Sequence, residues 1–125
     1  MQITSFNPLI VSTDPEAAIQ LFEELGFEKS HNNTNEINGK DIVNITMKDA
    51  NGFHVDITGG SRLERDMTII RMNVSDFDEA RAFLASKGFT SPSGRVVESK
   101  SSKSMLMVSP SGFGFDLCHH IKNHD

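Results

Sequence analysis

The residues with the clearest chemical potential are two aspartates at equivalent places in a repeated phrase. Residues 51–57 read NGFHVDI and residues 111–117 read SGFGFDL, so Asp56 and Asp116 each follow a Gly-Phe pair within an apolar, strand-like segment. A carboxylate in such a place can bind a divalent cation, pair with a basic side chain or hold a ligand. Because an unpaired carboxylate away from water costs roughly several kcal/mol, we expect each aspartate to have a partner.

Strand alternation predicts which side chains share a face with these carboxylates. An inward Asp56 carries His54 to the same face, and an inward Asp116 carries Gly114 and Cys118. His54 is a candidate for acid–base catalysis, because imidazole titrates near neutral pH, although a structural histidine fits as well. The opposite face, toward the helices, then receives the bulky apolar residues Phe53, Val55, Ile57, Phe113, Phe115 and Leu117.

The segment TIIRMNV, residues 68–74, adds a cation to this face. If Ile69 points inward, Arg71 and Asn73 follow it, and Ile70, Met72 and Val74 pack in the core. Arg71 could neutralise the aspartates as a structural ion pair, or it could donate two hydrogen bonds to an anionic group of a small ligand. Both interpretations stay open. Met105 and Met107 could line a pocket or pack in the core.

The aspartate phrases belong to a longer internal repeat. TDPEAAIQLFEELGF, residues 13–27, aligns with SDFDEARAFLASKGF, residues 75–89, and each follows an apolar segment. Each copy predicts a helix that begins at a capping side chain and ends at a glycine. The predicted caps are Asp14 and either Ser75 or Asp76, and the predicted ends are Gly26 and Gly88. The apolar stripes expected to face the core are Ala18, Leu21, Phe22 and Leu25, and Phe77, Ala80, Phe83 and Leu84.

Three strands are expected after the first helix, near 27–31, 42–48 and 53–58. After the second helix three are expected near 89–91, 95–100 and 104–109, followed by a further segment, 113–119, that closes the chain. The turn-forming phrases NNTN, NGK, DANG and two copies of SPSG separate them. The predicted fold is α+β, with two βαβββ modules that form a curved sheet around a concave pocket. A pair of ferredoxin-like βαβ units fits less well, because too many strands follow each helix.

The predicted boundaries are a first module over about 1–58, a linker over about 59–66 and a second module over about 67–120, within one domain of 125 residues. With this order of elements, the phrases PLIVSTDPEAAIQLFEELGFE, NGFHVDI and SPSGFGFDL resemble the vicinal oxygen chelate superfamily, which comprises glyoxalases, bleomycin-resistance proteins and dioxygenases. The resemblance covers nearly the whole chain and implies the glyoxalase-like fold.

The resemblance also implies four metal-ligand positions on the concave face. They correspond to Asn7, Asp56, Ile69 and Asp116, where family metal enzymes carry histidine and glutamate. The absence of histidine and the presence of an isoleucine disfavour catalysis by a transition metal. The remaining oxygen ligands would suit Mg²⁺ or Ca²⁺ better. We therefore expect neither a cofactor nor a catalytic metal, with Asp56 and Asp116 as the residues that would hold a divalent ion if one binds.

Composition narrows the class of partner. The formal net charge is −5 and lysine and arginine do not cluster, which disfavours nucleic acid and anionic membranes. The sequence predicts no membrane span and no signal peptide. The single cysteine, Cys118, fits a structural thiol in a reducing, cytoplasmic setting and excludes an intramolecular disulfide.

The resemblance to the drug-sequestering members implies that the chain binds a small organic molecule, for which an anionic group is one option, without a metal. The residues predicted to line the pocket are Asn7, His54, Asp56, Arg71, Asn73, Asp116 and Cys118. A homodimer is expected, since family members usually pair and open sheet edges seek partners. Two alternatives stay open: a metal-dependent lyase or isomerase using Asp56 and Asp116, and a protein-interaction module whose own side chains fill the pocket.

Overall fold

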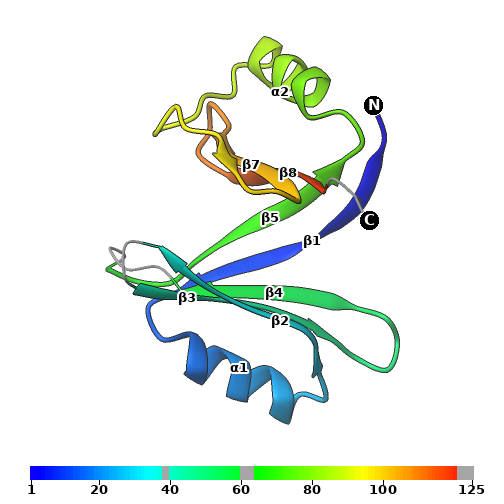
Figure 1. Ribbon diagram of the computed structural model, residues 1–125, viewed down its shortest axis with the longest axis vertical. Coiled ribbons are helices and arrows are strands. Elements are labelled where there is room, and N and C mark those ends of the chain that lie inside the picture. The colour runs from blue at the N-terminus through cyan, green and yellow to red at the C-terminus, as the bar shows by residue number, and fades with distance from the viewer. Residues whose placement is uncertain (38–39, 60–63, 121–125) are drawn as a thin grey trace. The chain divides into compact units, whose positions relative to one another are not determined.

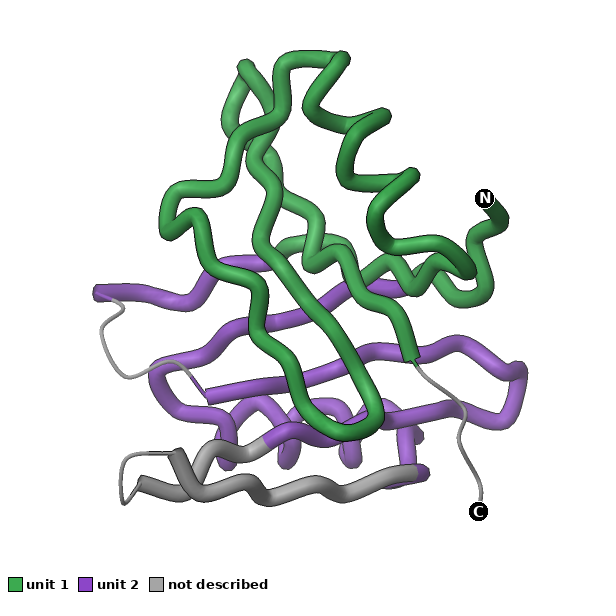
Figure 2. The backbone as a smooth tube through the Cα atoms, turned by 45° about the horizontal axis from the view of Figure 1, so that its top comes forward, with its two compact units in different colours: residues 1–6, 69–125 green, residues 7–68 purple. Residues whose placement is uncertain are grey.

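The computed structural model of the protein describes residues 1–37, 40–59 and 64–120, with the backbone alone over 31–37 and 40–43. The chain divides into two compact units (Figure 2). Unit 2 comprises residues 7–68, and unit 1 comprises residues 1–6 together with 69–125. The first residues of the chain therefore pack with its second half. That both units act as one domain, with the predicted module boundaries, stays a prediction.

Unit 2 has one helix and a mixed four-stranded sheet. Its elements are most of β1 (Ile3–Ser12), α1 (Pro15–Glu24), β2 (Glu28–Ile37), β3 (Lys40–Lys48) and β4 (His54–Gly59). The strand order is β2-β3-β4-β1, in which β4 and β1 are parallel and the other pairs are antiparallel. Figure 1 shows α1 lying along one face of this sheet.

Unit 1 repeats this order of elements. It contains most of β5 (Met67–Val74), α2 (Phe77–Ser86), β6 (Val97–Glu98), β7 (Ser102–Val108) and β8 (Gly114–His120). The strand order is β5-β8-β7-β6, with β5 and β8 parallel, and the first residues of β1 lie beside β5. Each unit is thus β-α-β-β-β, which confirms the predicted α+β class and the two βαβββ modules. The concave pocket stays a prediction.

The helix ends are where the sequence predicts them. Asp14 Oδ1 accepts a hydrogen bond of 3.2 Å from the Ala17 N–H, and Asp76 Oδ1 accepts one of 3.0 Å from the Glu79 N–H. These bonds satisfy amide groups that the first helical turn leaves without a helical partner. Each helix is followed by a glycine with a left-handed backbone, because only glycine adopts that conformation without strain.

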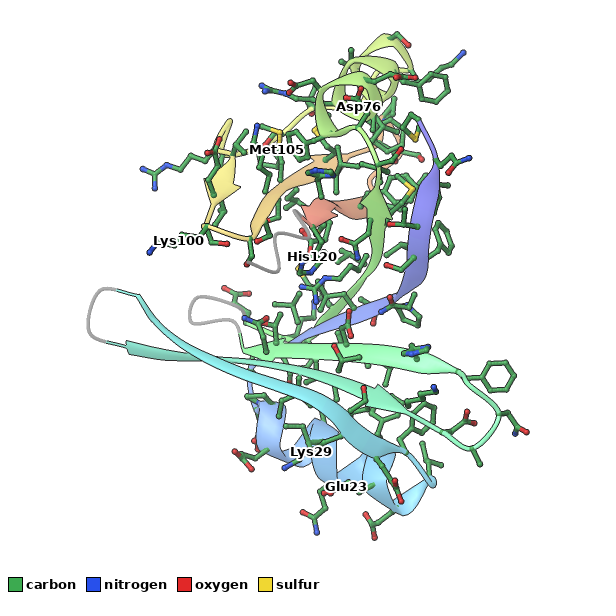
Figure 3. The ribbon with its side chains drawn as sticks, turned by 45° about the vertical axis from the view of Figure 1, so that its right-hand side comes forward. Glu23, Lys29, Asp76, Lys100, Met105 and His120 are labelled. Atoms are coloured by element: carbon green, nitrogen blue, oxygen red, sulfur yellow. The ribbon has the colours of Figure 1, made fainter. Side chains whose placement is uncertain are left out.

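Each helix covers one face of its own sheet with a small apolar core. The core of unit 2 consists of Ile19, Ile45, Met47, Val55 and Ile57. The core of unit 1 consists of Met72, Val74, Phe77, Ala80, Leu84, Met105, Met107 and Leu117. Ile57 and Leu117 are fully buried, and each such side chain contributes about 1.5–3 kcal/mol relative to leaving it exposed. Both methionines of β7 therefore pack in the core, and Figure 3 shows Met105 under α2.

For three residues of the predicted helical stripes, the prediction that they face the core is wrong. Leu21, Leu25 and Phe83 are 54%, 63% and 53% exposed. The contact stripe of α1 is instead centred on Ile19, with Ala18 and Phe22 beside it. Leu25 is the residue after the helix, so the helical period no longer orients it.

The prediction that Phe53 and Phe113 pack toward the helices is also wrong, since both side chains are more than half exposed. Each residue comes directly before a strand, because β4 begins at His54 and β8 begins at Gly114. The alternation of the strand therefore does not orient them. Phe113 contacts two other phenylalanines, Phe89 and Phe115, with ring centroids 5.7 Å away in each case.

One predicted strand and one predicted turn need correction. The segment 89–91 is not a strand, and only a single bridge joins Thr90 to Val108. The phrase NNTN, residues 32–35, is not a turn but lies inside β2, where backbone pairing with β3 overrides the low strand propensity of asparagine. Of the phrase NGK, residues 38–39 lie outside the described residues, as do residues 60–63 of the predicted linker.

The repeated phrase forms the same turn twice. In unit 2 the Asn51 and Phe53 N–H groups donate to Asp49 Oδ1, and in unit 1 the Gly112 and Phe113 N–H groups donate to Ser109 Oγ. Gly52 and Gly112 have φ angles of +86° and +109°, which explains why both copies carry glycine at that place. The turn starts the strand that carries Asp56 or Asp116.

Asp66 joins the segment before β5 to the start of α1 within unit 2. Its Oδ1 accepts from the Thr13 N–H at 2.9 Å and from the Thr13 hydroxyl, and its Oδ2 accepts from the Ser12 hydroxyl at 2.9 Å. These hydrogen bonds, above all that of the Thr13 N–H, lower the pKa of Asp66 below its ordinary value of 3.8. The ionised carboxylate therefore stabilises the folded state.

Replacing Gly88 tests the second helix end. Gly88→Ala should lower the free energy of unfolding by about 2–4 kcal/mol, because φ is +90° and the new Cβ would lie 2.8 Å from Pro110 Cγ. Gly26→Ala, with φ +103° and open space around the new Cβ, should cost only about 1–2 kcal/mol. Urea unfolding measures both values, and equal losses would contradict the role of Pro110.

Replacing Asp66 tests the hydrogen bonds of its carboxylate to Ser12 and Thr13, which we call the carboxylate clamp. Asp66→Asn should lower the free energy of unfolding at pH 7, and the difference from the natural protein should shrink as the pH falls below 3.8. The sign follows because a lowered folded-state pKa contributes stability above the unfolded pKa and loses it as the carboxylate is protonated. Unfolding curves at a series of pH values measure this, with Glu64→Gln as the control for charge. A difference that does not change with pH would argue against the clamp.

Candidate functional site

One face of the unit 1 sheet is polar because the other face packs under α2. Met72, Val74 and Leu117 point to the helix, so their neighbours along β5 and β8 point the other way. Arg71 lies directly opposite Asp116, and Asn73 lies opposite Cys118. Ser104 and Leu106 of β7 are the next partners of Cys118 and Asp116. We call this set the polar face: Ser5, Ile69, Arg71, Asn73, Ser104, Leu106, Gly114, Asp116 and Cys118.

An ion pair lies at the centre of the polar face. The Arg71 Nε–H donates to Asp116 Oδ2 at 2.9 Å, and the two side chains are 23% and 17% exposed. A guanidinium held in this way has a fixed orientation, and the pair has no net charge. Asp116 is therefore neutralised within its own unit, as the structural interpretation of Arg71 predicts.

Asn73 lies two residues further along β5. Its Nδ2 donates to the hydroxyl of Ser5 at 2.6 Å. Its Oδ1 is buried and has no hydrogen-bond partner among the described residues. Next to it, Cys118 is 7% exposed, and its Sγ lies 3.5 Å from the Asp116 carbonyl oxygen, to which the thiol donates.

The polar face also has an apolar end. Around Gly114, an added Cβ would lie 3.2 Å from Ile69 Cγ2 and 3.3 Å from Leu106 Cδ1. Glycine therefore lets these two side chains approach the backbone of β8. A ligand on this face would meet aliphatic surface as well as hydrogen-bonding groups.

Ser5 and Ser104 belong to the polar face but were not among the predicted site residues. The signal for Ser104 was present in the sequence, because the neighbouring Met105 is apolar and strand alternation sends its neighbours to the other face. Ser5 shares a strand face with Asn7, which was predicted, yet its contact with Asn73 joins segments 68 residues apart.

The remaining predicted site residues lie in unit 2. Asp56 is 5% exposed, and its neighbours on adjacent strands are Leu9 and Thr46. His54 is exposed at the first position of β4, and the Asn7 Nδ2 donates to the adjacent Pro8 carbonyl at 3.0 Å. That these residues line a common pocket with Arg71 and Asp116 stays a prediction.

Of the four implied metal-ligand positions, the two in unit 1 fit a metal poorly. Ile69 has no atom that can coordinate a cation, and one oxygen of Asp116 is bound to Arg71. Across the part of the chain that the structure describes, no three side chains of the His, Cys, Asp and Glu types are grouped to hold a metal ion.

Unit 2 has a separate surface pocket of about 310 Å³. It lies where α1 ends and where β2 and β3 meet, and none of the predicted site residues lines it. Its lining residues are Gly26, Glu28, Lys29, Ser30, Lys48, Asp49 and Ala50. Figure 3 shows Lys29 on the α1 side of the sheet.

Solved structures with the same arrangement identify the fold. Methylmalonyl-CoA epimerase from Mycobacterium tuberculosis matches with a TM-score of 0.70 and 16% identity, covering 94% of this chain and 89% of that one. A glyoxalase/bleomycin resistance protein/dioxygenase superfamily member from Vibrio splendidus 12B01 matches with a TM-score of 0.59 and 16% identity over 94% and 99% of the two chains. A V278E mutant of glyoxalase I from Zea mays matches with a TM-score of 0.66 and 12% identity, over 97% of this chain and 44% of that one.

The chain therefore has the vicinal oxygen chelate fold, as the sequence predicts. At such low identities the similarity establishes the fold and does not assign an activity. No protein-family model matches the sequence, and no curated protein matches it. Within the described residues, neither helix has the length and apolar character needed to cross a membrane.

The ion pair yields a prediction about stability. In a double-mutant cycle with Arg71→Met and Asp116→Asn, the two changes should be coupled by about 1–2 kcal/mol in the free energy of unfolding, because the charged hydrogen bond is largely shielded from water. Urea unfolding of the four proteins gives this coupling. A matched control is the more exposed pair of the Met1 amino group with Glu79, where Glu79→Gln should cost less than about 1 kcal/mol. Additive effects of the Arg71 and Asp116 changes would contradict the pairing.

Proposed function

We propose that this chain binds a small, uncharged organic molecule by hydrogen bonds on the polar face of unit 1, without a catalytic metal. The observation that carries this proposal is the ion pair of Arg71 with Asp116, next to Asn73. A half-buried strand surface with fixed polar groups and adjoining aliphatic side chains has the mixture typical of small-molecule sites.

The charge balance favours a neutral ligand over an anion. Asp116 offsets the charge of Arg71 at 2.9 Å, so a carboxylate ligand would have to compete with a carboxylate that is already bound. An anion would also lose its hydration without gaining a net positive field. A hydroxyl or amide group loses less solvation and can accept from a guanidinium whose orientation is fixed.

The side chains at the implied metal-ligand positions favour binding of a small molecule over metal-assisted catalysis. A metal-dependent lyase or isomerase would need the carboxylates of Asp56 and Asp116 on one ion, and one oxygen of Asp116 already accepts a hydrogen bond from Arg71, which lowers the negative charge available to a cation. The fold does not decide the question, because one fold hosts several chemistries. An epimerase and a glyoxalase are among the similar structures.

Two further features remain predictions. The homodimer rests on the family resemblance, and the cytoplasmic location rests on the single cysteine. The alternative of a protein-interaction module would require that the chain's own side chains fill the space above the polar face. Failure of every small molecule to reach this face would favour that alternative.

Titration of metal-free protein tests the proposed function. After treatment with EDTA, cyclohexanol should shift the backbone amide NMR signals of Arg71 and Asp116, and cyclohexanecarboxylate should bind no more tightly. The reason is that the ion pair offers polar contacts but no net charge. Asp78→Asn, on the exposed surface of α2, serves as the control and should leave both titrations unchanged.

Metal addition distinguishes the rival enzyme. Mn²⁺, Ni²⁺ or Mg²⁺ should leave the cyclohexanol titration unchanged. Stoichiometric metal binding that is lost in both Asp56→Asn and Asp116→Asn would overturn the proposal and favour a metal-dependent lyase or isomerase.

A further inference from the structure

We infer that Asn73 selects ligands that carry a hydrogen-bond donor, an O–H or an N–H, and that its amide is kept for binding at the expense of stability. This inference rests on the proposed function, because it concerns the same polar face. It adds a chemical class of ligand, neutral alcohols and amides, and a residue that determines specificity.

The two ends of the Asn73 amide have different surroundings. The Nδ2 end is fixed by the Ser5 hydroxyl at 2.6 Å. The Oδ1 end exposes less than 1 Å² and has no hydrogen-bond donor within the described part of the chain. A carbonyl oxygen can accept two hydrogen bonds, so the acceptor capacity of this group is unused.

Such an arrangement is unfavourable unless a ligand completes it. Leaving a buried acceptor without a donor destabilises a fold, and native structures contain few such groups. An aliphatic side chain at this position would avoid the cost, as Ile69 does on the same strand face. The hydrogen bond to Ser5 accounts for the Nδ2 end of the amide, but nothing in the fold accounts for the buried Oδ1 end.

Access to the oxygen requires only a small movement. Asn73 as a residue is half-buried, so one side of the side chain is still reachable. The last torsion of an asparagine side chain has a broad, shallow energy profile, so the amide can turn toward an arriving donor at the expense of part of its hydrogen bond to Ser5. Arg71 donates to Asp116, whereas Asn73 Oδ1 is the buried side-chain acceptor of this face that has no hydrogen-bond partner within the described part of the chain.

A matched pair of probes tests the inference. Cyclohexanol and cyclohexyl methyl ether share a ring and an oxygen, but only the alcohol can donate. We expect the dissociation constant of cyclohexanol to be about two- to tenfold lower, from the worth of one net hydrogen bond. In the Asn73→Leu/Ser5→Ala protein the difference between the two probes should vanish. NMR titration of the Arg71 and Leu106 amide signals measures all four constants.

The stability of the free protein provides a second, ligand-independent measurement. Asn73→Leu/Ser5→Ala should leave the midpoint of thermal unfolding unchanged or raise it, because it removes an unsatisfied acceptor together with its neighbour. The matched control is Asn44→Leu, a half-buried strand position in unit 2, which corrects for the general effect of an added apolar side chain.

The outcomes separate the two claims. If both probes bind equally to the natural protein, the polar face binds small molecules but Asn73 does not select donors, and the inference is overturned. If the variant unfolds several degrees lower than the natural protein, Asn73 has a structural role, and the inference is overturned as well. If neither probe shifts the signals, the proposed function fails and the inference fails with it.

Discussion

Among the described residues each unit has one helix, and one helix covers only one face of a sheet. This constraint accounts for the alternation of residue types along the middle of β5 and β8. Met72, Val74 and Leu117 must be apolar because α2 packs on them. Their neighbours Arg71 and Asp116 point away from α2, so they do not have to be apolar. The strand period of two residues thus places a core and a candidate site on opposite sides of the same two strands.

The internal repeat shows which parts of a unit are needed for folding and which are free to differ. The helix caps recur with the same hydrogen bonds. In both turns before the last strands the phenylalanine N–H donates to the side chain four residues earlier, even where Ser109 replaces Asp49. On the polar side the copies diverge. Arg71 faces Asp116 in unit 1, but Leu9 faces Asp56 at the equivalent place in unit 2. Features that the backbone requires are kept in both copies, and the residues on the polar side are not.

This difference also explains how much the sequence alone could predict. Caps, terminal glycines and strand alternation are local, so Asp14, Gly26 and the orientation of Arg71 were predicted correctly. The burial of a helical residue depends on which face the sheet covers, and this face is defined by Phe77, Ala80 and Leu84, so Phe83 was assigned to the core although it is exposed. The turn-like phrase NNTN lies in β2 because pairing with β3 outweighs local propensity. The contact of Ser5 with Asn73 joins distant segments, and no local pattern encodes it.

The ion pair and the asparagine place opposite demands on the polar face. Arg71 and Asp116 satisfy each other, so the pair contributes to the fold whether or not a ligand is bound. Asn73 is only half satisfied, because its Nδ2 donates to Ser5 while its buried Oδ1 has no partner among the described residues, and an unsatisfied buried acceptor is unfavourable. A surface selected for stability alone would favour an aliphatic side chain at position 73. Ile69 and Leu106 show that aliphatic side chains fit on the same face. A role in ligand binding therefore accounts for the amide of Asn73 better than packing does.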